Sequence, residues 1–224
     1  LDETKPTLDF PWTQRVTPPF WTEASNAVAQ WIPLAQNPSV RTILIMNAFY
    51  WMSLAGSQMT LLPLLLTDVH GMTATQIGQV YMGMSTVQIV GNPLFARVMD
   101  RVGKIPAMVG GCTLIGSSMA VLTLDWNLVA TLGLWSVGSS MLSTAPVAYV
   151  SDNVDDTQRA QAIAMLRTSG DVGFLVGASV TGAWADWTSL ELAMQSSAGM
   201  LLLATTWFGV RQYALRVAQQ KIAA

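Results

Sequence analysis

Long stretches without a charged side chain restrict what this chain can fold into. The sequence holds five such runs: Thr42 to Thr67, Gly71 to Ala96, Ile105 to Leu124, Trp126 to Ser151 and Leu192 to Val210. Each approaches or exceeds the roughly 20 residues that a helix needs to cross about 30 Å of hydrocarbon. A sixth stretch, Arg159 to Trp184, is equally long and carries Arg167 and Asp171 inside it. The pattern predicts helices that span a lipid bilayer.

The composition agrees with a membrane location. Charged residues make up 11% of the 224 residues and hydrophobic residues 51%, whereas soluble domains carry roughly 25% charged residues. We therefore predict an all-α membrane protein with six transmembrane helices in a domain over residues 38–217. The expected spans are about 40–66, 73–98, 105–124, 127–150, 158–184 and 190–212, and a C-terminal tail follows at 218–224.

Residues 1–37 differ from the rest and predict an N-terminal extramembrane arm. Five prolines are expected to break any long helix there: Pro6, Pro11, Pro18, Pro19 and Pro33. Trp21, Ala24, Val28 and Trp31 fall at helical spacing, which fits a short helix lying in the headgroup zone. A loop whose tryptophans contact neighbouring protein is the alternative.

Short polar motifs mark where several helices begin. Asn37 stands before a proline, which suits an N-cap followed by a first helical turn. Thr73 with Gln76, and Thr188 with Glu191, have the spacing of a capping box. The connections between spans are then short, about 3 to 10 residues, and short connections favour antiparallel neighbours.

The basic residues lie almost entirely on one side of the predicted bundle. Ten of the eleven Lys and Arg residues fall on the side of the arm. The loops of the opposite side contain no Lys or Arg, but they do contain Asp68, His70, Asp125, Asp186 and Glu191. By the positive-inside bias, the basic side is cytoplasmic, or stromal or matrix in an organelle. Both termini are expected on that side.

The turn between the second and third predicted spans has an ordered charge pattern. The segment Asp100-Arg101-Val102-Gly103-Lys104 resembles the signature turn of the major facilitator superfamily, roughly Gly-x-Leu-Ala-Asp-Arg-x-Gly-Arg-Arg. The sequence departs from this pattern at four positions: Ala96 and Val98 replace the first Gly and the Leu, Lys104 replaces the first Arg of the final pair, and Ile105 replaces the second. Simple retention of a charged turn on the inside is the alternative.

Two further segments resemble the same family. Residues 149–186 resemble an inside loop with the glycine-rich helix that follows it, and residues 37–66 resemble the helix that opens a six-helix half. The resemblance implies half of a twelve-span bundle, in which the substrate is held between the halves near the midplane. Because the arm resembles the linker between halves, the C-terminal half is the preferred match. The expected partners are the lipid bilayer and a second half or neighbouring subunits of a membrane complex.

The resemblance also implies a gate at the signature turn. Its candidate residues are Arg97, Asp100, Arg101, Gly103, Lys104 and Arg159. In the family, the Asp caps a helix or bridges to a basic residue, and the Gly allows the tight turn. Arg159 or Arg97 would then pair with Asp100 in one conformational state and release it in another. A solvated loop without a latch is the alternative.

Arg167 and Asp171 are the two charges inside a predicted span, and they lie four residues apart on one helix face. Counted from Arg159, they lie about 12 and 18 Å into the span. Ionisable groups at that depth predict a substrate-charge or proton-relay site. A self-neutralising pair, or an Arg167 that reaches back to the inside face, is the alternative. Other polar residues in the spans are candidates for the substrate path or for hydrogen bonds between helices: Asn47, Gln58, Gln88 and Asn92.

Glycines in the fifth predicted span indicate close helix packing. Gly173 and Gly177 have Gly-x-x-x-Gly spacing, and Gly182 continues the pattern of small residues. Small residues let two helix backbones approach closely, so packing is favoured over a hinge.

The sequence argues against enzymatic chemistry. His70 is the only histidine, so no Ser/His/Asp triad or multi-histidine metal site can form within the chain. No cofactor or metal is expected, and a net charge of −2 gives no reason to expect nucleic acid. The first hypothesis is secondary transport of a small solute by alternating access. The second is a non-transporting structural subunit of a large respiratory or photosynthetic membrane complex.

Overall fold

The computed structural model describes residues 20–124 and 127–223, and every regular element in them is a helix. The first element, α1, spans Phe20–Gln36. Six helical runs follow it: α2 (Pro38–Leu54) with the π-helix η2 (Ala55–Leu61) and α3 (Leu62–Asp68); α4 (Ala74–Val102); α5 (Lys104–Leu122); α6 (Leu128–Leu142) with α7 (Ala145–Asp152); α8 (Arg159–Trp187); and α9 (Leu190–Ala223). The predicted all-α fold class is confirmed.

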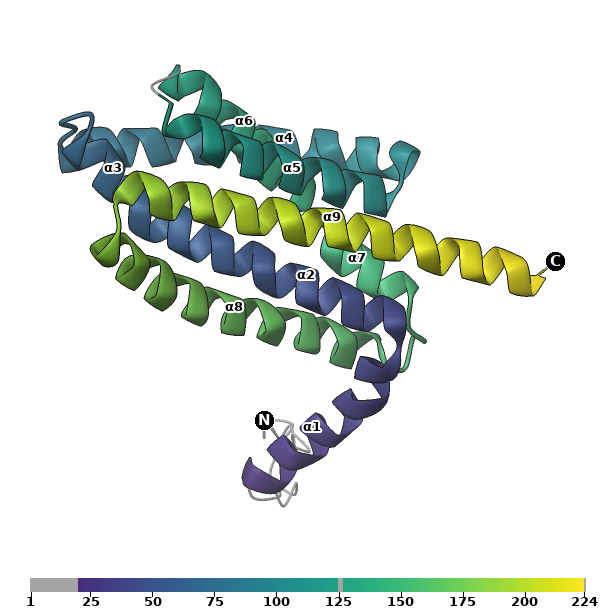
Figure 1. Ribbon diagram of the computed structural model, residues 1–224. Coiled ribbons are helices and arrows are strands. Elements are labelled where there is room, and N and C mark those ends of the chain that lie inside the picture. Colours follow the sequence, from purple (N-terminus) through teal and green to yellow (C-terminus); the bar gives the residue numbers. More distant parts are fainter. Residues whose placement is uncertain (1–19, 125–126, 224) are drawn as a thin grey trace, which may run out of the picture.

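The six runs lie side by side in one bundle (Figure 1). In this bundle α2 packs between α8 and α9, while α5 packs between α6 and α9. Met108, Ile115 and Met119 of α5 are fully buried, as are Trp135 of α6 and Phe208 of α9. The core is therefore built around α5, and α4 packs against α6 on the outside of it.

Local chemistry accounts for several helix starts. The side chain of Asn37 accepts a hydrogen bond from Ser39 N at 3.0 Å and caps α2. Thr73 and Gln76 form the predicted capping box at the start of α4. The predicted box at Thr188 is wrong, because Thr188 donates back to Trp184 O and it is Ser189 that accepts from Leu192 N at 3.1 Å.

Gly103 forms the whole connection between α4 and α5. It ends one helix and precedes the next, with φ at +99°, a backbone conformation that favours glycine. The chain therefore reverses at one residue, and Lys104 is already in the first turn of α5.

The helix α1 and the last turns of α9 extend outside the bundle (Figure 1). The part of the predicted arm at residues 1–19 lies outside the described residues. The helix α1 runs through Pro33, contrary to the expected break. Trp31 Nε1 of α1 donates to Gln161 Oε1 of α8 at 3.3 Å. At the other terminus, α9 continues as helix through the predicted tail as far as Ala223.

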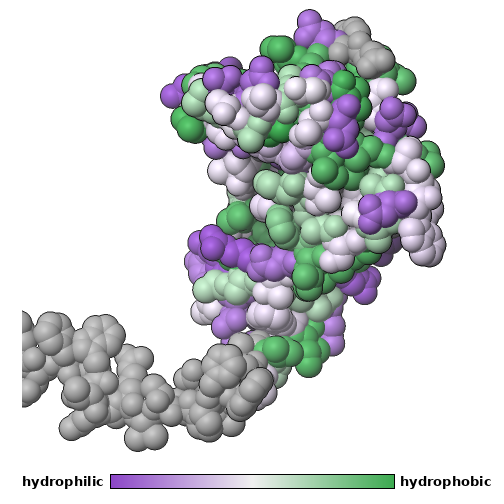
Figure 2. All heavy atoms as spheres, turned by 90° about the vertical axis from the view of Figure 1, so that its left-hand side faces the viewer, coloured by the Kyte–Doolittle hydropathy of each residue, from purple (hydrophilic) through white to green (hydrophobic). Residues whose placement is uncertain are grey.

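The starts of α2, α5 and α8 meet at one end of the bundle, where Asn37 Nδ2 donates to Asn153 O at 3.1 Å. The opposite end holds the turns after α3, α5 and α8. Asp68, His70, Asp186 and Glu191 are all exposed there. Figure 2 looks at the molecule from this opposite end, where hydrophilic and hydrophobic residues are interspersed on the surface.

Candidate functional site

A pocket of about 530 Å³ lies along the bundle and brings together four helical runs. We call it the central pocket. It is lined by Asn47, Tyr50, Trp51, Leu54, Gln58, Met59, Gln88, Ser139, Leu142, Ser143, Pro146, Val147, Leu166 and Arg167. These residues come from α2 with η2, from α4, from α6 with α7, and from α8. All of these residues fall within the predicted spans.

Four of the residues predicted for a substrate path line this pocket, namely Asn47, Gln58, Gln88 and Arg167. They lie 11 to 120 residues apart in the sequence, and the packing of the helices brings them together. Asn92 does not line it, and its buried Oδ1 has no hydrogen-bond partner within the described chain.

Arg167 and Asp171 do not form the ion pair that their spacing allowed. Both side chains are exposed, Asp171 does not line the pocket, and the ion pairs found in the described residues involve neither group. The order of the two charges disfavours the pair, because a cation that precedes its acid along the helix makes the weaker i,i+4 pair.

Asn47 is held in place by α8. Its Nδ2 donates to Leu166 O at 2.8 Å and to Ser169 Oγ at 3.0 Å. These two bonds join α2 to α8 directly beside the pocket. Asn47 thus makes the bonds between helices that were one of its two expected roles, while its side chain also lines the pocket.

Gln58 lies in the π-helix η2, which the sequence did not predict. Seven residues, Ala55–Leu61, leave the α-helical hydrogen-bond pattern in the middle of the first run. Such segments are rare and are frequent at functional sites. Tyr81 of α4 donates its hydroxyl to the backbone carbonyl of Gln58, so a side chain from a neighbouring run holds this segment. No propensity in the sequence marks this place, because the partner is distant in sequence.

The glycines of α8 set the distance between α8 and α2. A Cβ at Gly173 would lie 2.1 Å from Ala48 O, and a Cβ at Gly177 would lie 2.1 Å from Met52 O. Neither contact is sterically possible, so only glycine fits at these two positions. Gly182 differs, because a Cβ there would lie 3.8 Å from Thr60 Cγ2, an ordinary contact.

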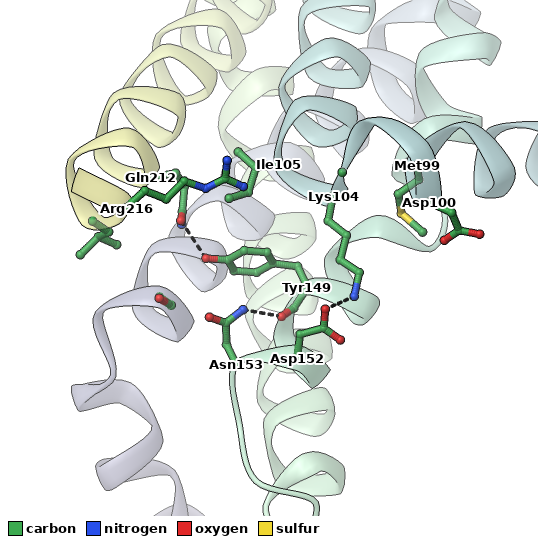
Figure 3. Close-up of a pocket in the computed structure, with 12 residues that line it drawn as sticks. Met99, Asp100, Lys104, Ile105, Tyr149, Asp152, Asn153, Gln212 and Arg216 are labelled. Carbon is green, nitrogen blue, oxygen red and sulfur yellow. Dashed lines mark hydrogen bonds and ion pairs between the residues drawn. The ribbon is translucent and has the colours of Figure 1, made fainter. Parts of the chain in front are cut away.

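A second pocket, of about 440 Å³, lies at the end of the bundle that holds the signature-like turn (Figure 3). We call it the turn pocket. It is lined by Ser39, Met99, Asp100, Gly103, Lys104, Ile105, Tyr149, Asp152, Asn153, Gln212, Leu215 and Arg216. Tyr149 donates its hydroxyl to Gln212 Oε1 at 2.8 Å and thereby joins α7 to α9 across the pocket.

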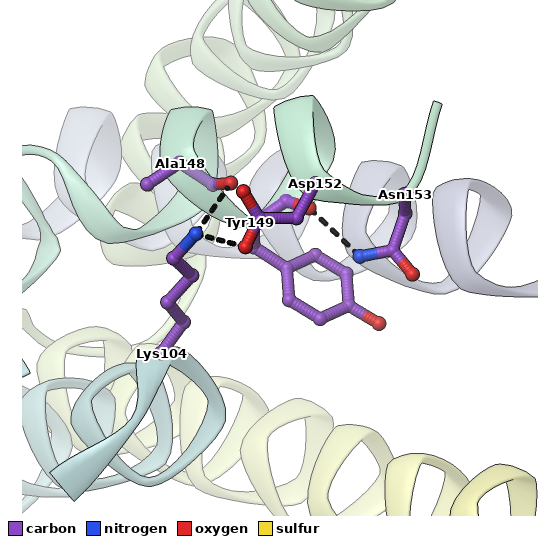
Figure 4. A network of polar contacts seen from close by, with 5 residues as sticks. All are labelled: Lys104, Ala148, Tyr149, Asp152 and Asn153. Carbon is purple, nitrogen blue, oxygen red and sulfur yellow. Dashed lines mark hydrogen bonds and ion pairs between the residues drawn. The ribbon is translucent and has the colours of Figure 1, made fainter. Parts of the chain in front are cut away.

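Lys104 joins α5 to α7 at this pocket (Figure 4). Its Nζ forms an ion pair with Asp152 and donates to Ala148 O at 3.1 Å. On the same helix, Asn153 donates to Tyr149 O at 2.8 Å. The Lys104 amine thus contacts both a carboxylate, of Asp152, and a backbone carbonyl, of Ala148, in the last turns of α7.

The candidate gate residues have other partners than the resemblance implied. Asp100 lines the turn pocket, but within the described chain it is in neither ion pair. Arg159 instead pairs with Asp156 at 2.6 Å, and Arg97 and Arg101 are exposed. In this conformation it is Lys104, another of the candidate gate residues, that makes the electrostatic contact of the turn, and its partner is Asp152 rather than Asp100.

Two runs among the described residues qualify by length and apolar composition as membrane spans. They are Lys104–Leu122, with mean hydropathy 1.7, and Leu128–Asp152, with mean hydropathy 1.3. A helical bundle with such runs, a polar pocket shared by four runs and a one-residue turn at one end is consistent with the predicted class, a multi-pass helical membrane protein.

The comparisons with known proteins agree. The family model of the Major Facilitator Superfamily matches residues 43–223, and the chain belongs to this superfamily of transporters. It is therefore an integral, multi-pass membrane protein. An uncharacterized MFS-type transporter of Yersinia pestis is 27% identical over 150 residues, which cover 66% of this chain and 39% of that protein. A second, from Methanocaldococcus jannaschii, is 25% identical over 123 residues, which cover 52% of this chain and 31% of that protein.

A solved structure shows the same fold. The human organic anion transporter MFSD10 (TETRAN) superposes with a TM-score of 0.69 at 17% identity, over 76% of this chain and 40% of that one. The present chain thus matches well under half the length of each of these proteins. This confirms the predicted resemblance to a major facilitator half-bundle.

Proposed function

We propose that the chain forms one six-helix half, the C-terminal one, of a secondary transporter that moves a small solute by alternating access. The observation that carries this proposal is the central pocket, where polar side chains from four helical runs converge. Polar groups inside a membrane are energetically costly, so a bundle with a purely structural role is not expected to place amides and a cation around one cavity.

The cost of exposing polar groups to lipid also argues for a second six-helix half. Arg167 and Trp51 line the central pocket and are exposed in the isolated bundle. Lipid cannot satisfy the hydrogen bonds of such a face, so we propose that a second six-helix half covers it. That half is another part of a longer chain, another chain or a second copy.

For orientation, we propose that both termini lie on the cytoplasmic side, or on the stromal or matrix side of an organelle. The support is the charge distribution. Arg41, Lys104, Arg159 and Arg216 lie at the end of the bundle where the turn pocket opens, and the opposite end exposes acids.

An untargeted transport assay tests the proposal without a known substrate. The protein, in the form in which its own membrane holds it, is reconstituted into vesicles that are exposed to a solute mixture, and the trapped solutes are identified by mass spectrometry. Ser143→Trp fills the central pocket, whereas Thr113→Trp adds the same bulk at an exposed position of α5 outside it.

The expected result is a solute enriched in wild-type and Thr113→Trp vesicles and absent from Ser143→Trp vesicles. If Ser143→Trp vesicles enrich the solute as wild-type vesicles do, the transport path does not run through this pocket. If no solute is enriched by any form, the transport proposal fails and the alternative, a structural subunit of a larger membrane complex, is favoured.

A further inference from the structure

The charge balance of the central pocket indicates what kind of solute it holds. Among the described residues that line it, Arg167 is the one charged side chain. The other polar groups of the lining are neutral amides, hydroxyls and an indole, contributed by Asn47, Gln58, Gln88, Tyr50, Ser139, Ser143 and Trp51. The pocket therefore carries a net positive charge.

The elements around the pocket supply no carboxylate to neutralise this charge. The segments α2, η2 and α6 contain no Asp or Glu. In α4 the one acid is Asp100, twelve residues or about 18 Å of helix beyond Gln88. In α7 the one acid is Asp152, which is paired with Lys104.

The remaining nearby acid, Asp171, lies on α8 one turn beyond Arg167, but it neither lines the pocket nor pairs with the arginine. An arginine roughly 12 Å into a membrane span without a counter-charge is costly. A bound anion removes that cost, because a guanidinium holds a carboxylate by two parallel hydrogen bonds.

Aromatic rings form part of the wall of the same pocket. Trp51 lies 5.6 Å from Tyr50 in an edge-to-face arrangement, measured between ring centroids, and 6.4 Å from Phe174. Trp51 and Tyr50 both line the pocket, together with Leu54 and Leu142. The cavity volume of about 530 Å³ is that of a small-molecule site.

We propose that the central pocket selects an organic anion, with its carboxylate-type group on Arg167 and its apolar or ring-bearing body against Tyr50 and Trp51. Gln58 and Gln88 offer amide N–H donors to the same group. This inference rests on the proposed transport function and specifies the substrate class of the same site.

The test uses matched pairs of a carboxylate and its own carboxamide, which differ chiefly in charge. Acetate, benzoate, phenylacetate and 2-naphthoate are compared with their amides, and benzylammonium serves as the cationic probe. Binding to the purified protein is measured by calorimetry, and flux is measured in vesicles. The expected result is that a ring-bearing carboxylate binds about 10- to 100-fold more tightly than its amide.

Variants assign this preference to the arginine. Arg167→Gln should remove the preference for the carboxylate over its amide, and Arg167→Lys should keep part of this preference. Arg211→Gln, which removes an exposed charge on α9 outside the pocket, is the matched control and should behave as wild type. If the glutamine variant does not fold, the carboxylate preference of the lysine variant is compared with that of wild type instead.

The outcomes separate the two proposals. Carboxylate binding that depends on Arg167, without flux of any probe, supports the anion site and contradicts transport. Flux of an amide or of benzylammonium that is independent of Arg167 supports transport and overturns the anion proposal. If no carboxylate binds better than its amide, Arg167 is not an anion site, and an acid from the second half is then its partner.

Discussion

Gly177 of α8 lies directly against the carbonyl of Met52 on α2, so closely that a methyl group on the glycine would stand 2.1 Å from that oxygen. Gly173 makes the same contact with Ala48 O one turn earlier. Two helix backbones therefore touch along a full turn beside the central pocket. This contact fixes the spacing of α2 and α8, and with it the relative positions of Asn47 and Arg167.

The first prediction concerns this contact. Gly177→Ala or Gly173→Ala should destabilise the bundle by about 1–3 kcal/mol or more, because a backbone carbonyl cannot move aside as a flexible side chain can. The measurements are the melting temperature in detergent and the yield of monodisperse protein. Gly182→Ala on the same helix is the control and should be tolerated, since its Cβ would have an ordinary contact at 3.8 Å. Equal effects at all three positions would contradict close packing as the role of Gly173 and Gly177.

The second prediction concerns the π-helix. Tyr81→Phe removes the hydroxyl that donates to the carbonyl of Gln58. The change should cost about 1–3 kcal/mol, because a carbonyl in the bundle loses its partner. Hydrogen exchange in Ala55–Leu61 should rise more than in α5. Tyr213→Phe, at a tyrosine of α9 that is 71% exposed, provides the control and should change neither quantity. Unaltered exchange in η2 would show that the hydroxyl does not hold this segment.

The third prediction concerns Lys104 and Asp152. Their side chains are 27% and 59% exposed, so a double-mutant cycle with Lys104→Met and Asp152→Asn should give a coupling free energy of only about 0.2–1 kcal/mol. The coupling should shrink with added salt, because exposed pairs are screened. Lys104→Met alone should cost more than Asp152→Asn, since the amine also donates to Ala148 O. Additive effects of the two substitutions would show that the pair contributes nothing.

Much of the fold could be predicted from the sequence because the membrane imposes a simple pattern. Long uncharged runs predict membrane-spanning helices. The starts of α2 at Asn37 and of α4 at Thr73 follow from capping hydrogen bonds between residues no more than three apart. The predicted box at Thr188 failed because Ser189 competes for the same backbone donors one residue later. Local rules of this kind cannot decide between adjacent candidates.

The site was harder to predict because it depends on packing between distant residues. The position of Arg167 deep within a predicted span indicated a functional residue, and Arg167 does line the central pocket. Its spacing on the helix also allowed a pair with Asp171, but the ion pairs found in the described residues involve neither group, which agrees with the weaker order of cation before acid. The π-helix at Gln58 and the aromatic wall at Tyr50 and Trp51 had no local signal, since each depends on what the neighbouring run supplies.

Accessibility of Gln88 from the two sides of the membrane tests the central claim most directly. Cys112 is the only cysteine of the sequence, so Gln88→Cys in a Cys112→Ala background offers one thiol in the central pocket. Sealed vesicles are treated with a membrane-impermeant maleimide from the outside or from the inside. Met119→Cys, at a fully buried position of α5, is the control and should stay unlabelled. Alternating access predicts labelling of Gln88→Cys from both sides, whereas labelling from one side only, or from neither, would contradict it.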